Sequence, residues 1–168
     1  YGLGVLAANC EANGILCSIV NLNNEILKAA SIDEDKFDFT LTWQNALKKA
    51  LSESSVKPDL IGLTCMFSQT HRSLMDVSSY LQKNIDIPVA LGGVHTSNSI
   101  SAENIRSKFI VDLDGVNLFF LYESDVSFLN FIKFVNRDGD ISSLGATFFH
   151  YPGEEDIFYN KIERPVGA

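Results

Sequence analysis

LIGLTCMFSQTHRSLMDVSSYLQKNIDIPVALGG, residues 60–93, decides the fold of this chain. The stretch opens with a short apolar run, Leu60 to Met66, of the kind that forms a strand covered on both faces by helices. Leu74, Val77 and Leu81 then recur at helical spacing, and a second apolar run follows over Ile87–Leu91. A strand, a helix and a second strand in this order predict a parallel β-α-β unit.

The same alternation is expected beyond this unit. Gly92-Gly93 is interpreted as the turn at the carboxyl end of the second strand, and Ser101–Ser107 as a short helix. Further along, we expect strands over Phe109–Leu113 and Leu118–Leu121 and an amphipathic helix over Val126–Val135. Two aromatic-rich runs then flank Pro152-Gly153, a pattern that predicts a β-hairpin.

The residues before position 60 predict two further helices and a strand. Tyr1–Gly4 is expected as a loop that enters a helix ending at Asn13-Gly14, and the β-branched run Ile15–Val20 as a buried strand. Thr42 is expected to cap a helix with Ala46, Leu47, Ala50 and Leu51 on one side. Because a parallel sheet needs a strand before its first helix, we expect that strand to lie upstream of Tyr1.

These elements predict an α/β domain with an open parallel sheet, helices on both faces and a C-terminal β-hairpin. We expect residues 1–143 to form the α/β domain, without its first strand. Residues 144–168 are expected to form the hairpin and the start of a linker to a following domain.

The composition sets limits on the class of protein. The 168 residues are 46% hydrophobic and 20% charged, with a formal net charge of −8, which indicates a single soluble globular domain. No apolar run approaches the roughly 20 residues of a membrane span, and no signal peptide opens the chain, so a cytoplasmic protein is expected. The basic residues are scattered, which argues against nucleic acid as a partner.

Individual polar residues give no catalytic centre and no metal site. Cys10, Cys17 and Cys65 are too widely spaced for a CxxC metal site, and we expect reduced, buried thiols. His71, His95 and His150 lie on separate segments, and hydrogen-bonding or surface roles are expected for His71 and His150. The acidic runs Asp33-Glu34-Asp35 and Glu154-Glu155 are interpreted as solvated loops.

Ligands of open α/β sheets bind beyond the carboxyl ends of the strands, which directs attention to the loops there. Gly92-Gly93 would let the backbone approach a bulky ligand or adopt positive φ, although a tight structural turn explains the same pair equally well. The loop Thr64–Ser68 combines hydroxyl groups with apolar side chains, which suits a large, flat, partly polar ligand. A helix N-cap at Ser68 or Thr70 is the alternative explanation.

Three segments together resemble the cobalamin-binding domain family: IGLTCMFSQTHRSLMDVSSYL, IPVALGGVHTS and YESDVSFLNFI. The resemblance covers most of the chain and is closest to the amino-terminal cobalamin-binding domain of radical SAM enzymes. The loops of that domain typically read P-x-L-G, I-G-x-S/T, G-G-x-H and G-E-G-E. The corresponding positions here are Gly2-Leu3-Gly4, Ile61-Gly62-Leu63-Thr64, Gly92-Gly93-Val94-His95 and Tyr122-Glu123-Ser124-Asp125.

The resemblance implies a flavodoxin-like (Rossmann-like) fold, with the corrin ring across the strand ends and the nucleotide tail between the sheet and the helices. It implies that Thr64 and Ser68 contact the tail or the ring edge, that Gly92 and Gly93 leave room for the nucleotide, and that His95 and Thr96 line its mouth. The full set of cofactor-binding residues that it implies is Tyr1, Leu3, Gly4, Thr64, Cys65, Met66, Ser68, Gly92, Gly93, His95, Thr96 and Glu123.

Two departures from the family pattern bear on this expectation. Some family members ligate cobalt through the histidine of a D-x-H-x-x-G loop, and alignment on Gly4 places Tyr1 at that histidine, so the resemblance implies cobalamin held without a histidine lower ligand. Tyr122 and Ser124 replace both glycines of G-E-G-E, and Tyr122 would narrow the gap that they provide. A degenerate domain of the same fold, acting as a structural or docking element, therefore stays open as an alternative.

The resemblance implies a cobalamin-binding module of a radical SAM-type enzyme, serving methyl transfer or radical chemistry done by another domain. This chain has no C-x-x-x-C-x-x-C motif, so the iron–sulfur cluster and S-adenosylmethionine are expected only in a C-terminal radical SAM domain outside it. A response regulator or a flavin-binding protein is less favoured, because neither a phosphoacceptor Asp cluster nor a Ser/Thr-rich phosphate loop is found at the first strand end. The chain alone is not expected to be catalytic.

Overall fold

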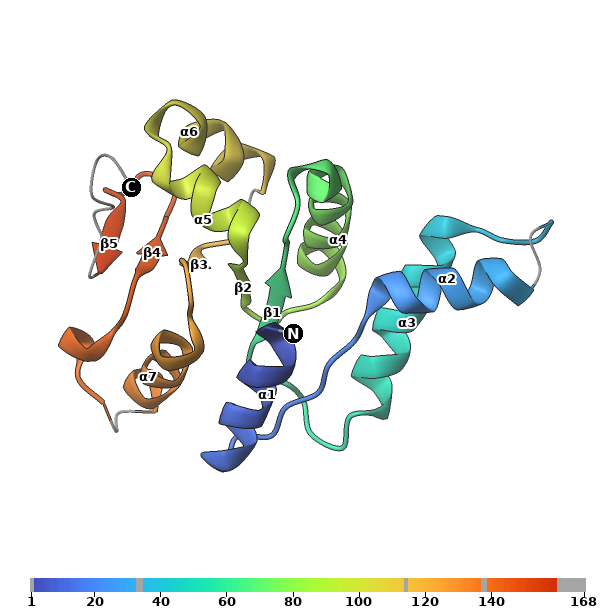
Figure 1. The fold of residues 1–168 in the computed structure, drawn as a ribbon, viewed down its shortest axis with the longest axis horizontal. Coiled ribbons are helices and arrows are strands. Elements are labelled where there is room, and N and C mark those ends of the chain that lie inside the picture. The colour runs from blue at the N-terminus through green and yellow to red at the C-terminus, as the bar shows by residue number, and fades with distance from the viewer. Residues whose placement is uncertain (1, 33–34, 114, 137–138, 160–168) are drawn as a thin grey trace. The chain divides into compact units, whose positions relative to one another are not determined.

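The structure is a computed structural model that describes residues 2–32, 35–113, 115–136 and 139–159. The chain divides into two compact units, Tyr1–Asp59 and Leu60–Ala168 (Figure 1). No helix in the described ranges is both long and apolar enough to span a bilayer.

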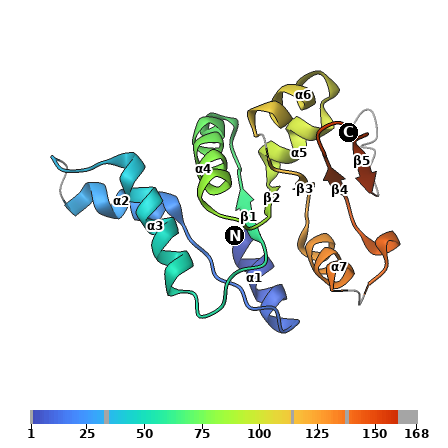
Figure 2. The same ribbon diagram turned by 180° about the vertical axis from the view of Figure 1, so that it is seen from behind.

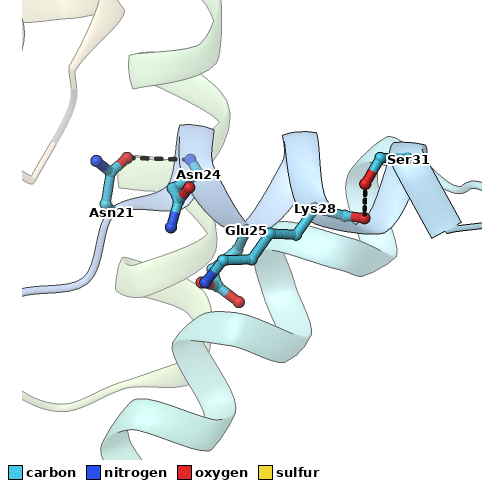
Figure 3. A network of polar contacts seen from close by, with 5 residues as sticks. All are labelled: Asn21, Asn24, Glu25, Lys28 and Ser31. Atoms are coloured by element: carbon cyan, nitrogen blue, oxygen red, sulfur yellow. Dashed lines mark hydrogen bonds and ion pairs between the residues drawn. The ribbon is translucent and has the colours of Figure 1, made fainter.

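The regular elements that the structure describes in the first unit are all helices. It contains α1 (Gly2–Ala12), α2 (Leu22–Ile32) and α3 (Phe39–Glu53), and α2 packs against α3. On α2 the exposed polar groups bond to one another: Asn21 Oδ1 accepts from the Asn24 N–H at 3.1 Å, and Lys28 Nζ lies 2.9 Å from Glu25 Oε1 (Figure 3). Such exposed pairs add little to stability, and this face of α2 is a solvated surface.

Several sequence predictions for this unit were wrong. Leu3 and Gly4 belong to α1 rather than to a loop, because the Leu- and Ala-rich run after them favours helix. Ile15–Val20 forms no strand, and Leu16 is 84% exposed. A strand needs a neighbouring strand for its backbone hydrogen bonds, and the described part of this unit offers helices only.

The cap of α3 also differs from the prediction. Asp38, rather than Thr42, occupies the N-cap, and its Oδ1 accepts from the Leu41 N–H at 2.8 Å. Thr42 lies one turn inside the helix, where its hydroxyl donates to the Asp38 carbonyl. Both residue types favour helix starts, so the pattern alone did not decide between them.

The second unit contains a five-stranded mixed sheet in the order β1-β2-β3-β4-β5 (Figures 1 and 2). Its first three strands are parallel and its last two antiparallel, so the expected open parallel sheet is confirmed only in part. The predicted C-terminal hairpin is confirmed as β4 and β5, and the boundary expected after residue 143 stays a prediction. The strands are β1 (Ile61–Thr64), β2 (Val89–Gly92), β3 (Leu118–Phe120), β4 (Thr147–Phe149) and β5 (Ile157–Tyr159).

Helices and short 3₁₀ turns connect the strands of this unit. The expected helix over Ser101–Ser107 is instead two helices separated at Ala102, and the expected strand over Phe109–Leu113 lies mostly in the second of them. A short apolar run fits a buried helix face as well as a strand, so periodicity could not separate the two. The elements are η1 (Ser68–Thr70), α4 (His71–Asn84), α5 (Val94–Ser101), α6 (Glu103–Asp112), α7 (Asp125–Val135) and η2 (Ile141–Ser143).

Helices cover both faces of the sheet, as expected. Adjacent residues of a strand point to opposite faces. The Phe119 ring has its centroid 6.4 Å from that of Phe109 on α6, whereas Phe120 contacts Phe128 and Phe131 of α7 at 5.3 and 5.6 Å. The sheet is therefore packed between α6 on one side and α7 on the other.

All three cysteines are free thiols. Cys10 and Cys65 are buried as expected, but Cys17 is exposed because the strand predicted around it does not form. Burial, followed by the neighbouring Cys17, raises the pKa of the Cys10 thiol. Cys10 is therefore a poor nucleophile at neutral pH, since the thiolate is the reactive form.

Candidate functional site

The loops after β1 and β2 lie side by side, as the topology predicts. The Cys65 N–H donates to the Gly92 carbonyl at 3.1 Å, and the His95 N–H donates to the Cys65 carbonyl at 3.2 Å. We call Thr64–Ser68 together with Gly92–Ser97 the strand-end rim. It unites eight of the predicted cofactor-binding residues: Thr64, Cys65, Met66, Ser68, Gly92, Gly93, His95 and Thr96.

The two glycines of the rim have different structural roles. Gly93 has φ 102°, and a Cβ there would lie 2.5 Å from the Cys65 carbonyl oxygen and 2.9 Å from Thr64 Oγ1. Gly93 is thus required by the close approach of the two loops. A Cβ on Gly92 would meet nothing nearer than 3.6 Å, so the space beside Gly92 is open to a small group.

A strip of small residues leads from β1 and β2 to the rim, exposed on β1 and buried or half-buried on β2. Gly62 pairs with Ala90 and Thr64 with Gly92, so all four lie on the sheet face that α7 covers farther along. Gly62 and Thr64 are exposed, and a Cβ on Gly62 would have no neighbour within 4 Å. We call Gly62, Thr64, Ala90 and Gly92 the small-residue strip.

The loop after β1 presents apolar side chains beside this strip. Met66 is 55% exposed and Phe67 64% exposed, whereas Cys65 is only 4% exposed. The Cys65 thiol lies 3.2 Å from Thr70 Oγ1, so it is directed into the loop. Ser68 is exposed. Thr70 occupies the N-cap position of α4, as the alternative explanation expected, although its side chain makes no cap hydrogen bond.

Several hydroxyl groups of the rim bond to its own backbone. Thr96 is fully buried, and its Oγ1 donates to the Gly92 carbonyl at 3.0 Å. Ser97 Oγ donates to the Gly93 carbonyl and accepts from the Tyr122 N–H at 2.7 Å. These hydroxyl groups fix the start of α5 in place.

Tyr122, which the resemblance aligns with a glycine of G-E-G-E, has a backbone conformation that favours glycine. Its φ is 61°, in the left-handed region that favours glycine. Its hydroxyl lies 3.0 Å from Ser101 Oγ at the end of α5, so the side chain runs along that helix. Glu123, the predicted binding residue after it, is exposed in the loop before α7.

The histidine of the rim is paired with a second histidine. His95 Nε2 lies 3.2 Å from Nδ1 of His71, and His71 Nε2 lies 3.1 Å from Asp112 Oδ2. Burial, followed by the neighbouring His71, lowers the pKa of His95. A hydrogen-bonding role was expected for His71, but its contact with His95 was not, although each histidine follows one of two adjacent parallel strands.

The remaining predicted residues lie in the first unit. Leu3 and Gly4 are exposed on α1, and Tyr1 lies outside the described residues. Their expected part in cofactor binding stays a prediction. His150, on the far side of the hairpin turn from Asp156, bonds to that carboxylate through Nδ1 at 2.8 Å, which confirms the hydrogen-bonding role expected for it.

Two cavities of the second unit lie away from the small-residue strip. One of about 410 Å³ is lined by α4 and Asp112, and another of about 240 Å³ by Ile110, Val116, His150 and neighbouring residues. Within the described ranges, no three His, Cys, Asp or Glu side chains are grouped as metal ligands.

No family model, curated protein or solved structure matches this chain. The functional assignment therefore depends on the residues and geometry of the rim.

Proposed function

We propose that this chain is the cobalamin-binding module of a radical SAM-type enzyme, with a flavodoxin-like arrangement of its parallel strands. The observation that carries the proposal is the open face of β1, where exposed Gly62 and Thr64 lead to the exposed apolar loop at Met66 and Phe67. Such a surface differs from an ordinary covered strand of an α/β sheet.

The chemistry of a corrinoid suits this surface. A corrin ring is large and flat, and residues without bulky side chains, such as Gly62 and Gly92, allow a flat ligand to approach the backbone closely. Thr64 and Ser68 present hydroxyl groups that can bond to the amide groups at the ring edge. Met66 and Phe67 offer apolar contact area to the ring itself.

Some of the predicted binding residues at the rim are exposed and others are buried. Thr64, Met66 and Ser68 are exposed at the rim, which fits direct contact with a ligand. Cys65 and Thr96 are buried with hydrogen-bond partners of their own, which fits a role in shaping the rim. When bound, cobalamin supplies methyl transfer or radical chemistry, and the part of this chain is to orient and shield it.

Titration of the purified chain with hydroxocobalamin, followed by its visible spectrum, tests the proposal. We expect a dissociation constant of about 10 µM or tighter. Gly62→Phe puts a ring on the small-residue strip at a position where a Cβ meets no atom within 4 Å, and should weaken binding at least tenfold. Val135→Phe adds the same ring at an exposed position of α7 and should leave the affinity unchanged. Absence of a spectral change at saturating cobalamin would rule out the assignment.

A second function is favoured by the packing around Gly93. The Cβ position of Gly93 is filled by Cys65 and Thr64, so this glycine serves the contact between two loops and leaves no space for a nucleotide. That observation supports a domain of the same fold that binds no cofactor and serves as a structural or docking element. The same titration separates the two functions, because only the first gives saturable binding that Gly62→Phe removes.

A further inference from the structure

Side chains from three helices form a hydrogen-bonded chain beside the strand-end rim. His95 of α5 and His71, the first residue of α4, lie with Nε2 and Nδ1 3.2 Å apart. The other nitrogen of His71, Nε2, lies 3.1 Å from Oδ2 of Asp112 at the end of α6. The other nitrogen of His95, Nδ1, lies 3.5 Å from the Ser99 hydroxyl.

The partners determine where the protons are when both rings are neutral. The Asp112 carboxylate only accepts, so His71 carries its proton on Nε2 and accepts on Nδ1. His95 must then donate through Nε2 and accept the Ser99 hydroxyl on Nδ1. Every ring nitrogen has a partner in this state.

The two hydrogen-bonded histidine rings can take up one extra proton and stay in contact, but not two. When His71 holds one extra proton, its Nδ1–H can donate to Nε2 of His95, and His95 then carries its own proton on Nδ1. With both rings protonated, two N–H groups face each other across 3.2 Å and no acceptor lies between them. Like charges at this distance repel, so the contact between the two rings is lost.

The surroundings add to the cost of double protonation. The Phe109 ring of α6 packs on both imidazoles, with centroids 5.4 and 5.3 Å away, and gives neither an acceptor. His71 and His95 also stand at the starts of α4 and α5, where the helix dipoles disfavour positive charge. Asp112 is the carboxylate that faces the pair, and the nearby Arg72 is paired with Asp76 at 3.3 Å on the exposed side of α4.

We propose that His71 and His95 form a pH-sensitive contact that holds the two loops of the strand-end rim together at neutral pH and releases them in acid. His71 directly follows η1, which ends the first loop, and the His95 N–H bonds to the Cys65 carbonyl of that loop. Separation of the two rings therefore loosens both the loop after β1 and the loop after β2. This proposal does not rest on whether the rim holds a corrinoid.

The lowered pKa of His95 gives the sign of the effect. In the unfolded chain the ring titrates near 6.5, and in the folded chain it titrates below that value. Between the two pKa values the unfolded chain binds a proton that the folded chain does not. The free energy of unfolding is therefore unaffected by this group above pH 6.5 and falls as the pH drops through that window.

An NMR titration of the imidazole Cε1–Hε1 signals in the full chain is the first test. We expect His95 to titrate with a midpoint below 6.5. A midpoint for His95 at or above 6.5 overturns the proposal.

Hydrogen exchange of the Cys65 and His95 amides is the second test. Their protection factors should fall at least tenfold between pH 7.5 and pH 5.0, whereas the core Phe119 amide keeps its protection. In His95→Gln the side-chain amide of glutamine can still donate to His71 but does not titrate. The fall in protection should therefore be absent in this variant. His150→Gln, at the histidine paired with Asp156, should behave as the unmodified chain does. An equal fall in His95→Gln, or none in the unmodified chain, contradicts the proposal.

Discussion

Two glycines, Gly62 and Gly93, show that the absence of a Cβ serves different purposes at different positions in and beside the rim. Gly62 and Gly93 are both part of the sequence motifs that suggested a ligand site. In the structure Gly93 faces Cys65 at the contact between two loops, whereas Gly62 faces open space. The sequence predicted that glycines gather at the strand ends, but only the three-dimensional neighbours separate the two roles.

The first prediction at this scale concerns those two glycines. Gly93→Ala combines positive φ with a Cβ 2.5 Å from a carbonyl oxygen, and should lower the free energy of unfolding by about 2 kcal/mol or more. Gly62→Ala meets no atom within 4 Å and should be neutral or stabilising by up to about 1 kcal/mol. Urea denaturation measures both. Equal stability of the two variants would show that the two loops do not approach as closely as described.

At the scale of elements, short apolar runs were the hardest features to interpret. Leu118–Leu121 was correctly predicted as a strand, but the similar run Phe109–Leu113 lies mostly in α6. Ile15–Val20 has a strand-like composition and forms none, because its described surroundings contain no strand to pair with. In these runs composition decides neither the type of element nor its burial, since Leu16 is 84% exposed, and both depend on tertiary partners.

The second prediction concerns the helix on the face of the small-residue strip. Phe128 of α7 is half-buried against Phe120, with ring centroids 5.3 Å apart. Because only part of the ring is buried, Phe128→Ala should lower the free energy of unfolding by about 2 kcal/mol, less than for a fully buried ring.

Val126→Ala is the matched control on the same helix. Val126 is 70% exposed, so its truncation should change stability by less than about 0.5 kcal/mol. Thermal unfolding followed by circular dichroism provides the comparison. If both truncations are equally mild, α7 does not pack on this face of the sheet.

Across the whole molecule, the sequence predicted the second unit far better than the first. In Leu60–Ala168 the strands β1, β2 and β3, the helices α4 and α7 and the final hairpin lie where alternation and turn residues placed them. In Tyr1–Asp59 the helix α2 was not predicted, and an expected strand is absent from the described residues. In the second unit strands and helices alternate along the chain and neighbouring strands pair, whereas Ile15–Val20 finds no strand to pair with in the described part of the first unit.

For the candidate site, the sequence predicted which loops meet but not which side chains contact one another. Topology alone placed the loops after β1 and β2 together, since parallel neighbours end at the same edge of a sheet. The side-chain partners were not predictable, because the His71–His95 contact joins residues 24 positions apart and Asp112 lies 41 positions from His71. Contacts of that kind depend on how helices pack and leave no periodic pattern in the sequence.

Amide hydrogen exchange of the chain with and without methylcobalamin locates the functional surface most directly. If the strand-end rim and the small-residue strip hold the cofactor, saturating methylcobalamin should slow exchange in residues 62–68 and 92–97 and leave α2 and α3 unchanged. Unaltered exchange in both segments, or slowing confined to another part of the chain, would contradict the account of where this protein binds its ligand.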